Sequence, residues 1–123
     1  MKNHSILIVE DELPLVQALT TKLQRAGFNV LVAKNGEEGL SLAKSHHPDL
    51  LLVDLLMPRM DGMTMIRKLR EDKWGAAARI IILTNLSDTA KAEEAEKFGV
   101  HEYLVKTDWK LEEVVRKIKE ALA

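Results

Sequence analysis

Residues 50–54 read Leu-Leu-Leu-Val-Asp, a run of four apolar residues closed by an acid. The run is too short for a typical helix and shows no alternation of apolar and polar residues, so it predicts a strand with both faces buried. Residues 79–83, Arg-Ile-Ile-Ile-Leu, repeat this pattern. Strands of this kind are typical of parallel sheets that helices cover on both sides. This stretch therefore predicts an α/β domain.

The rest of the chain alternates short strand-like runs with helical periods. One helix carries the apolar stripe Leu15, Leu19, Leu23 and Ala26, with Pro14 suited to its first turn and Gly27 to its C-terminal cap. Five strands alternating with five helices predict a doubly wound parallel sheet with helices on both faces. The other predicted strands are 6–9, 29–33 and 102–105, and the other predicted helices are 37–45, 63–72, 89–98 and 111–122.

Length and composition predict one domain that spans residues 1–123. The chain is 46% hydrophobic and carries 18 basic and 19 acidic residues, a net charge of -1. This balance gives no electrostatic footprint for nucleic acid or for an anionic membrane, so we expect neither as a partner. The sequence has no cysteine and no apolar run of the roughly 20 residues that span a bilayer. A cytoplasmic location is the expectation.

Polar residues follow four of the five predicted strands. In doubly wound folds, the carboxyl ends of the strands face the ligand crevice, so these side chains should converge. Clustered carboxylates repel one another and favour a hard divalent cation such as Mg²⁺, while lysine and hydroxyl groups can donate to phosphoryl oxygens. An aspartate beside a metal can itself accept a phosphoryl group. The converging residues are Glu10, Asp11 and Glu12 after the first strand, Asp54 after the third, Thr84 after the fourth and Lys106 after the fifth.

Four segments together resemble the response-regulator receiver family of two-component signalling. They are Val-Glu-Asp-Glu at 9–12, Val-Asp-Leu-Leu-Met-Pro-Arg-Met-Asp-Gly at 53–62, Leu-Thr-Asn at 83–85 and Tyr-Leu-Val-Lys at 103–106. The resemblance extends over essentially the whole chain. It implies the strand order 2-1-3-4-5 and a switch, not a multiple-turnover enzyme, that takes a phosphoryl group from a histidine kinase or phosphotransfer protein with Mg²⁺.

The resemblance also implies a role for each residue of the site. Asp54 would be the phosphoacceptor, and Thr84 and Lys106 would bind the phosphoryl group. Movement of Thr84 would let Tyr103 turn inward and change the surface of helix 89–98, strand 102–105 and helix 111–122, which an output protein or domain reads. The metal would be held by Asp54, by Asp11 directly, by Glu10 through water and by the backbone carbonyl of Leu56.

Two other functions are compatible with part of this pattern. A pseudo-receiver would bind a partner without being phosphorylated, although every acidic, hydroxyl and lysine position here is filled. A phosphatase of the haloacid-dehalogenase type would have a second acid two residues after its nucleophile, where this chain has Leu56. We interpret Glu12 as a first-turn acid outside the site and Asp61 as a helix N-cap.

The chain departs from the receiver pattern at two places, Thr107 and Asn85. Thr107 stands where the family has a proline in a cis bond, so we expect a trans peptide after Lys106 and expect Thr107 or Asp108 to cap the last helix. Asn85 is larger than the residue that the family favours. Leu56 and Leu86 are apolar at positions that in this family face the phosphoryl group, which predicts a long-lived phosphorylated state.

Overall fold

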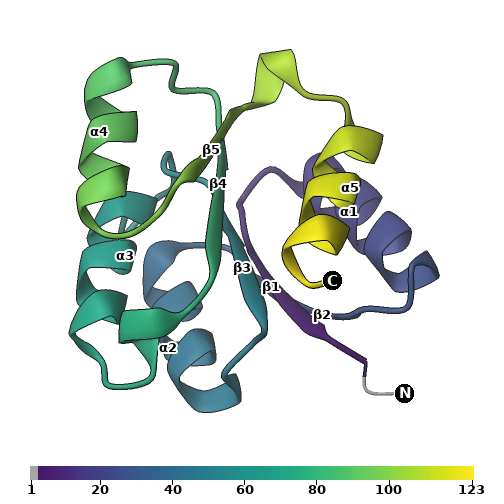
Figure 1. Cartoon of the computed structure of the whole chain (residues 1–123), viewed down its shortest axis with the longest axis horizontal. Coiled ribbons are helices and arrows are strands. Elements are labelled where there is room, and N and C mark those ends of the chain that lie inside the picture. The colour runs from purple at the N-terminus through teal and green to yellow at the C-terminus, as the bar shows by residue number, and fades with distance from the viewer. Residues whose placement is uncertain (1–2) are drawn as a thin grey trace.

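The computed structural model describes residues 3–123 and contains one five-stranded parallel sheet (Figure 1). The strand order is β2-β1-β3-β4-β5, as the resemblance implied. From β1 the chain first adds β2 on one side and then crosses to add β3, β4 and β5 on the other side. This reversal of strand order at β1 and β3 places helices on both faces of the sheet. The strands are β1 Ser5–Val9, β2 Asn29–Ala33, β3 Leu50–Val53, β4 Ile80–Thr84 and β5 Glu102–Val105.

The helices fall into two layers around the sheet. α1 and α5 pack on one face, and α2, α3 and α4 pack on the other (Figure 1). Two short 3-10 helices, η1 Gly75–Ala77 and η2 Lys106–Asp108, precede β4 and follow β5. The α-helices are α1 Leu13–Arg25, α2 Gly36–His46, α3 Gly62–Glu71, α4 Thr89–Lys97 and α5 Leu111–Ala121.

Alternation along the strands divides the apolar residues between two cores. Leu51 and Val53 of β3 face the layer of α2, α3 and α4, while Leu50 and Leu52 face α1 and α5. All residues of β3 and β4 are buried, which confirms the prediction drawn from their continuous apolar runs. Within residues 3–123, no helix combines the length and the apolar character needed to cross a membrane.

The predicted helix ends lie within one residue of the observed ones. Gly27 adopts a positive φ of 96° directly after α1, and the Phe28 N–H donates to the Leu23 carbonyl, so the glycine allows the turn that closes the helix. The Asp61 carboxylate accepts from the Thr64 N–H at 2.8 Å and caps α3, as predicted. In α1, Val16 is buried with Leu19 and Leu23, whereas Leu15 and Ala26 of the predicted stripe are only half-buried.

Two predictions near the ends of β4 and β5 were wrong. β4 begins and ends one residue later than expected, so Thr84 is its last residue instead of the first after it. Thr107 and Asp108 do not cap α5. They belong to η2, and the Glu113 carboxylate instead accepts from the Lys110 N–H at 2.8 Å, because the chain needs one further turn to reach the helix. The Lys106–Thr107 peptide is trans, as expected.

Candidate functional site

The site lies at the carboxyl ends of β1, β3, β4 and β5, which are neighbours in the sheet. β1 and β3 pair with Val9 beside Val53, so the residues that follow them, Glu10 and Asp54, emerge side by side. Thr84 pairs with Val105 at the end of β4, which brings Lys106 to the same edge. The parallel register therefore gathers residues that lie far apart in the sequence.

Three carboxylates form a compact cluster at this edge. Glu10, Asp11 and Asp54 each offer one oxygen, and these oxygens all lie within 4.8 Å of one another. Glu10 is 3% exposed and Asp54 is 5% exposed, whereas Asp11 faces solvent. Oxygens of this kind at this spacing suit a hard divalent cation, with Asp11 open to water. The donor set therefore fits a Mg²⁺ site.

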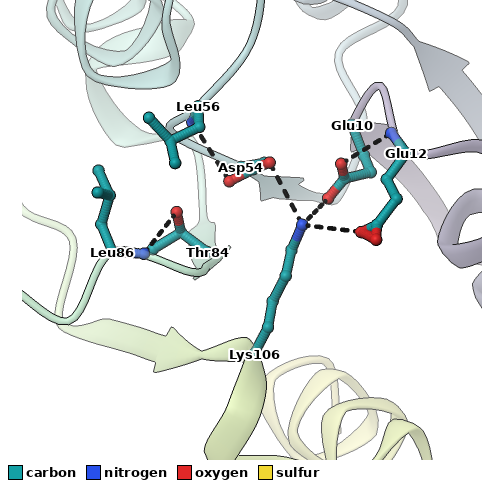
Figure 2. A network of polar contacts seen from close by, with 7 residues as sticks. All are labelled: Glu10, Glu12, Asp54, Leu56, Thr84, Leu86 and Lys106. Carbon is teal, nitrogen blue, oxygen red and sulfur yellow. Dashed lines mark hydrogen bonds and ion pairs between the residues drawn. The ribbon is translucent and has the colours of Figure 1, made fainter.

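Lys106 places its ammonium group among the carboxylates (Figure 2). Its Nζ lies 2.8 Å from Glu10 Oε1, 3.3 Å from Asp54 Oδ2 and 3.4 Å from Glu12 Oε2. The side chains of Lys106, Glu10 and Asp54 are 13%, 4% and 5% exposed, so water screens these two ion pairs only weakly, whereas the Glu12 side chain is 55% exposed. One ammonium group thus bridges the ends of β1 and β3 from β5.

Burial and ion pairing shift the pKa values of Glu10 and Lys106. Burial raises the pKa of Glu10, aided by the charge of Asp54, and outweighs the opposing effect of hydrogen bonds from Lys106 and the Glu12 N–H. Burial alone would lower the pKa of Lys106, but its contacts with Glu10 and Asp54 outweigh burial and raise it. The lysine is therefore held in its charged form.

Close backbone packing fixes the loop that carries Asp54. A Cβ on Gly62 would lie 2.2 Å from the Asp54 carbonyl oxygen, so only glycine lets α3 begin this close to the strand end. The Gly62 N–H also donates to the Leu55 carbonyl at 3.1 Å. Within the loop, the Leu56 N–H donates to Asp54 Oδ1 at 3.3 Å. Sequence spacing alone did not reveal this amide as a partner of the aspartate.

Thr84 and Tyr103 contact the same residue of the β4–α4 loop. The Leu86 N–H donates to the buried Thr84 Oγ1 at 3.4 Å, and the Tyr103 hydroxyl donates to the Leu86 carbonyl at 2.7 Å. Burial, followed by the charges of Asp88 and Asp54, raises the pKa of Tyr103 and keeps its hydroxyl protonated as a donor. Both residues predicted to act in the switch thus contact one residue, Leu86, through its N–H and its carbonyl.

The structure brings one further residue into the cluster. Glu12 was interpreted as a first-turn acid outside the site, but it occupies the N-cap position of α1, and its carboxylate pairs with Lys106 at the exposed rim. The Glu10 carboxylate accepts from the Glu12 N–H at 3.0 Å, which holds the start of α1 against the site. The position of Glu12, two residues after Glu10 at the end of the same strand, could have indicated in the sequence that Glu12 reaches the site.

Comparison with known proteins identifies the family. A model described as the response regulator receiver domain matches residues 6–119. The chain belongs to this family. Its site is the acidic pocket of a receiver domain of the CheY-like type, a module of two-component signalling.

Relatives and solved structures agree with this assignment. The chain is 36% identical over 117 residues to response regulator ArlR of Staphylococcus aureus. The matched region covers 95% of this chain and 52% of ArlR. The chain spans about half the length of the curated relatives that it matches, from 41% to 52%.

Two similar structures carry magnesium in their descriptions. A chain of the CheX–CheY–BeF3–Mg²⁺ complex from Borrelia burgdorferi has a TM-score of 0.87 and 27% identity, and covers 98% of this chain and 90% of its own. The receiver domain of sensor histidine kinase PA1611 from Pseudomonas aeruginosa, with a magnesium ion coordinated in its active-site cleft, has a TM-score of 0.86 and 26% identity, and covers 98% of both chains. The acidic cluster of the present chain is typical of such a magnesium site.

The lysine contacts predict a strong energetic coupling between Lys106 and Glu10. In a double-mutant cycle with Lys106→Met and Glu10→Gln in chelator, we expect a coupling of about 1–3 kcal/mol from urea unfolding, because both groups are shielded from water.

The Lys106→Met substitution should also reduce the free energy of unfolding more at neutral pH than at mildly acidic pH. Without the ammonium group, the folded-state pKa of Glu10 rises further above its unfolded-state value. The folded protein then favours protonated Glu10, so the free energy of unfolding falls as the pH rises and Glu10 has to ionise.

The exposed pair of Lys22 and Glu112 provides the matched control. Its atoms are 2.9 Å apart, close to the 2.8 Å of the buried pair, but the side chains are 36% and 66% exposed. The same cycle with Lys22→Met and Glu112→Gln should give less than about 1 kcal/mol. Equal couplings for the two pairs would show that burial in the site does not strengthen the ion pair.

Proposed function

We propose that this receiver domain is a phosphorylation switch in which Asp54 accepts a phosphoryl group from a histidine kinase or phosphotransfer protein. The observation that carries the proposal is the setting of the Asp54 carboxylate. It is buried beside the carboxylates of Glu10 and Asp11, with Lys106 Nζ at 3.3 Å and the Thr84 hydroxyl on the neighbouring strand. An acceptor, a cation site and two phosphoryl-binding donors meet at one strand edge.

Mg²⁺ is the proposed cofactor. Asp11 and Asp54 would bind it directly, Glu10 would act through water, and the Leu56 carbonyl would complete the protein ligands. When bound, the cation offsets the negative charge that gathers as the phosphoryl group approaches three carboxylates. The exposure of Asp11 supports the assignment, because Mg²⁺ keeps several water ligands in most protein sites.

The chain's own residues would perform the transfer by positioning and charge. A carboxylate oxygen of Asp54 attacks phosphorus, the bond from phosphorus to the donor's imidazole nitrogen breaks, and the imidazole leaves with the bonding electron pair. The Lys106 ammonium group can exchange its contact with Asp54 for a phosphoryl oxygen, and the Thr84 hydroxyl can donate to another. The Leu56 N–H donates to Asp54 Oδ1 at 3.3 Å, so it would lie near a phosphoryl group carried by Asp54.

The proposed output is a change of the α4–β5–α5 surface. Donation to the phosphoryl group would draw the Thr84 hydroxyl toward Asp54, and the Leu86 N–H, which donates to Thr84 Oγ1 at 3.4 Å, would follow it or lose this bond, so the β4–α4 loop would move. The Leu86 carbonyl in that loop also accepts a hydrogen bond from the Tyr103 hydroxyl, so movement of the loop would allow the half-buried ring to take a new position. An output protein or domain that reads α4, β5 and α5 would then distinguish the two states.

Asp54→Asn should abolish phosphorylation. After incubation with acetyl phosphate and Mg²⁺, the parent protein should gain the mass of one phosphoryl group in a base-labile, acid-stable adduct, and the variant should not, because an amide is not a nucleophile. Intact-protein mass spectrometry measures both. Asp61→Asn is the matched control, since this nearby aspartate only caps α3 and asparagine caps equally well. Labelling of Asp54→Asn at the parent rate would exclude Asp54 as the acceptor, and no labelling of either would favour a pseudo-receiver.

Millimolar Mg²⁺ should raise the melting temperature of the unphosphorylated protein. The cation binds only the assembled carboxylates, so it stabilises the folded state by mass action, by about 2.7 kcal/mol at one hundred times its Kd. Asp11→Asn should reduce this response, whereas Asp61→Asn should keep it. Thermal unfolding in Mg²⁺ and in chelator provides the measurement, and an identical response of Asp11→Asn and the parent would remove Asp11 from the metal site.

The phosphorylated state should be long-lived. Leu56 and Leu86 lie on the Thr84 side of Asp54 (Figure 2), and neither side chain can orient a water molecule for attack on phosphorus. The double variant Leu56→Asn and Leu86→Glu should therefore lose the phosphoryl group about tenfold faster, which corresponds to 1.4 kcal/mol of barrier. Decay of the label measured by mass gives the rate. Leu13→Asn, a change at an equally exposed leucine, is the control, and an unchanged rate in the double variant would show that these leucines do not set the lifetime.

A further inference from the structure

Helix α4 is attached unevenly to the rest of the receiver domain. Within residues 89–97, all of which the structure describes, Ala95 of the last turn is the one buried residue, and the first two residues are exposed. Phe98 and Val100, which follow the helix, pack into the same core as α2 and α3. Apolar burial therefore holds the C-terminal end of α4 and leaves the N-terminal end with little packing.

The polar contacts of the N-terminal end are mostly internal. The Asp88 carboxylate caps the helix, and Lys91 pairs with Glu94 at 3.6 Å, so both contacts stay within α4 and its cap. The loop before the helix contacts β5 through Leu86, whose carbonyl accepts from the Tyr103 hydroxyl at 2.7 Å. This end of α4 is thus connected to the sheet through the loop residue that the proposed switch moves.

Arg70 of α3 holds the other end of α4. Its Nε donates at 2.7 Å to the carbonyl of Phe98, the C-cap residue of α4, and its Nη1 donates to the Gly75 and Ala78 carbonyls at 2.8 and 2.7 Å. A hydrogen bond from an ionised donor is roughly twice as strong as one between neutral groups. A cation at this position also complements the helix dipole. The C-terminal end of α4 therefore has both apolar packing and a charged donor.

The group that anchors α4 is itself closely packed. The Gly75 N–H donates to the Asp72 carboxylate at 2.9 Å, which connects η1 to the end of α3. A Cβ on Gly75 would collide with the Leu69 carbonyl oxygen, so η1 lies directly against the backbone of α3. The carbonyl partners of Arg70 in and after η1 therefore keep the guanidinium group fixed relative to α3.

We propose that Arg70 is a positioning residue of the switch, which fixes the C-terminal end of α4 as a pivot for the N-terminal end. This role rests on the phosphorylation of Asp54 proposed above. When the β4–α4 loop moves, residues 88–92 move with it and residues 95–100 stay in place. The first turn of α4, together with Tyr103, is then the part of the output surface that distinguishes the two states.

Amide hydrogen exchange of the unphosphorylated protein tests the anchor. The Val100 N–H donates to the Ala95 carbonyl at 3.0 Å, and the Ala92 N–H donates to the Asp88 carbonyl at 3.4 Å, so these two amides report the two ends of α4. After correction for intrinsic rates, Val100 should exchange about tenfold more slowly than Ala92 or slower still, because the less packed end opens more easily. NMR of the ¹⁵N-labelled protein provides both rates.

Arg70→Met should loosen the anchored end alone. Exchange of Val100 should become about tenfold faster or more, as expected for loss of a charged donor, while Ala92 is unchanged. Leu51, which is fully buried in β3, is the reference amide, because its exchange reports global unfolding. Equal acceleration of Val100 and Leu51 would show that Arg70 supports the whole fold and not the end of α4.

Two further variants complete the test. Arg67→Met is the matched control, because this exposed arginine of the same helix donates to Thr64 Oγ1 within α3, and its loss should leave Val100 unchanged. Tyr103→Phe removes the bond to Leu86 and should accelerate exchange of Ala92 without affecting Val100. This variant and the parent protein keep the pivot testable if Arg70→Met does not fold.

Beryllofluoride with Mg²⁺, a phosphoryl mimic, tests the movement. Amide shift changes at Leu56 report occupancy of Asp54, and changes within α4 of the parent protein should be confined to residues 88–92. In Arg70→Met they should extend to residues 95–100. An absent change at Leu56 would count against the phosphorylation switch itself. A change at Leu56 with equal changes at both ends of α4 in the parent would overturn the pivot alone.

Discussion

The contact of Lys106 with Glu10 and Asp54 is the interaction on which the receiver domain's site depends. Two buried carboxylates at the ends of adjacent strands repel each other, and their charged forms lose hydration inside the protein. The ammonium group at 2.8 and 3.3 Å reduces both costs. Since it comes from the end of β5, the far edge strand of the sheet is connected to the central strands through charge as well as through hydrogen bonds.

This arrangement makes the site sensitive to any added charge. A phosphoryl group on Asp54 would bring about 1.5 to 2 further negative charges to a cluster that has one ammonium group. The groups able to respond are Lys106 and Thr84, and Thr84 is already engaged with the Leu86 N–H. The Leu86 carbonyl accepts a hydrogen bond from the Tyr103 hydroxyl, so under the proposed mechanism a change at Thr84 would reach β5 through a single loop residue.

Arg70 joins three elements at the opposite end of the sheet from the carboxylates. Its Nε donates to the Phe98 carbonyl at the end of α4, and its Nη1 donates to the Gly75 and Ala78 carbonyls in and after η1. The guanidinium group of α3 therefore holds the end of α4 against η1 through backbone carbonyls.

The sequence by itself determined the elements and the end of the sheet at which the acidic residues gather. Continuous apolar runs such as residues 50–53 specify buried strands locally, and polar residues at the strand ends converge in any sheet of this class. The motifs around Asp54 and Lys106 were sufficient to predict the strand order through family resemblance.

Only the tertiary structure decided which partners each side chain has. Glu12 reaches Lys106 across 94 positions of sequence, and the cap of α5 moved from Thr107 or Asp108 to Lys110 with Glu113 because η2 intervenes. The hydrogen bonds from Arg70 to three backbone carbonyls were also invisible in the sequence. Such contacts depend on how elements dock, and docking is set by the packing of the whole core and not by local residue patterns.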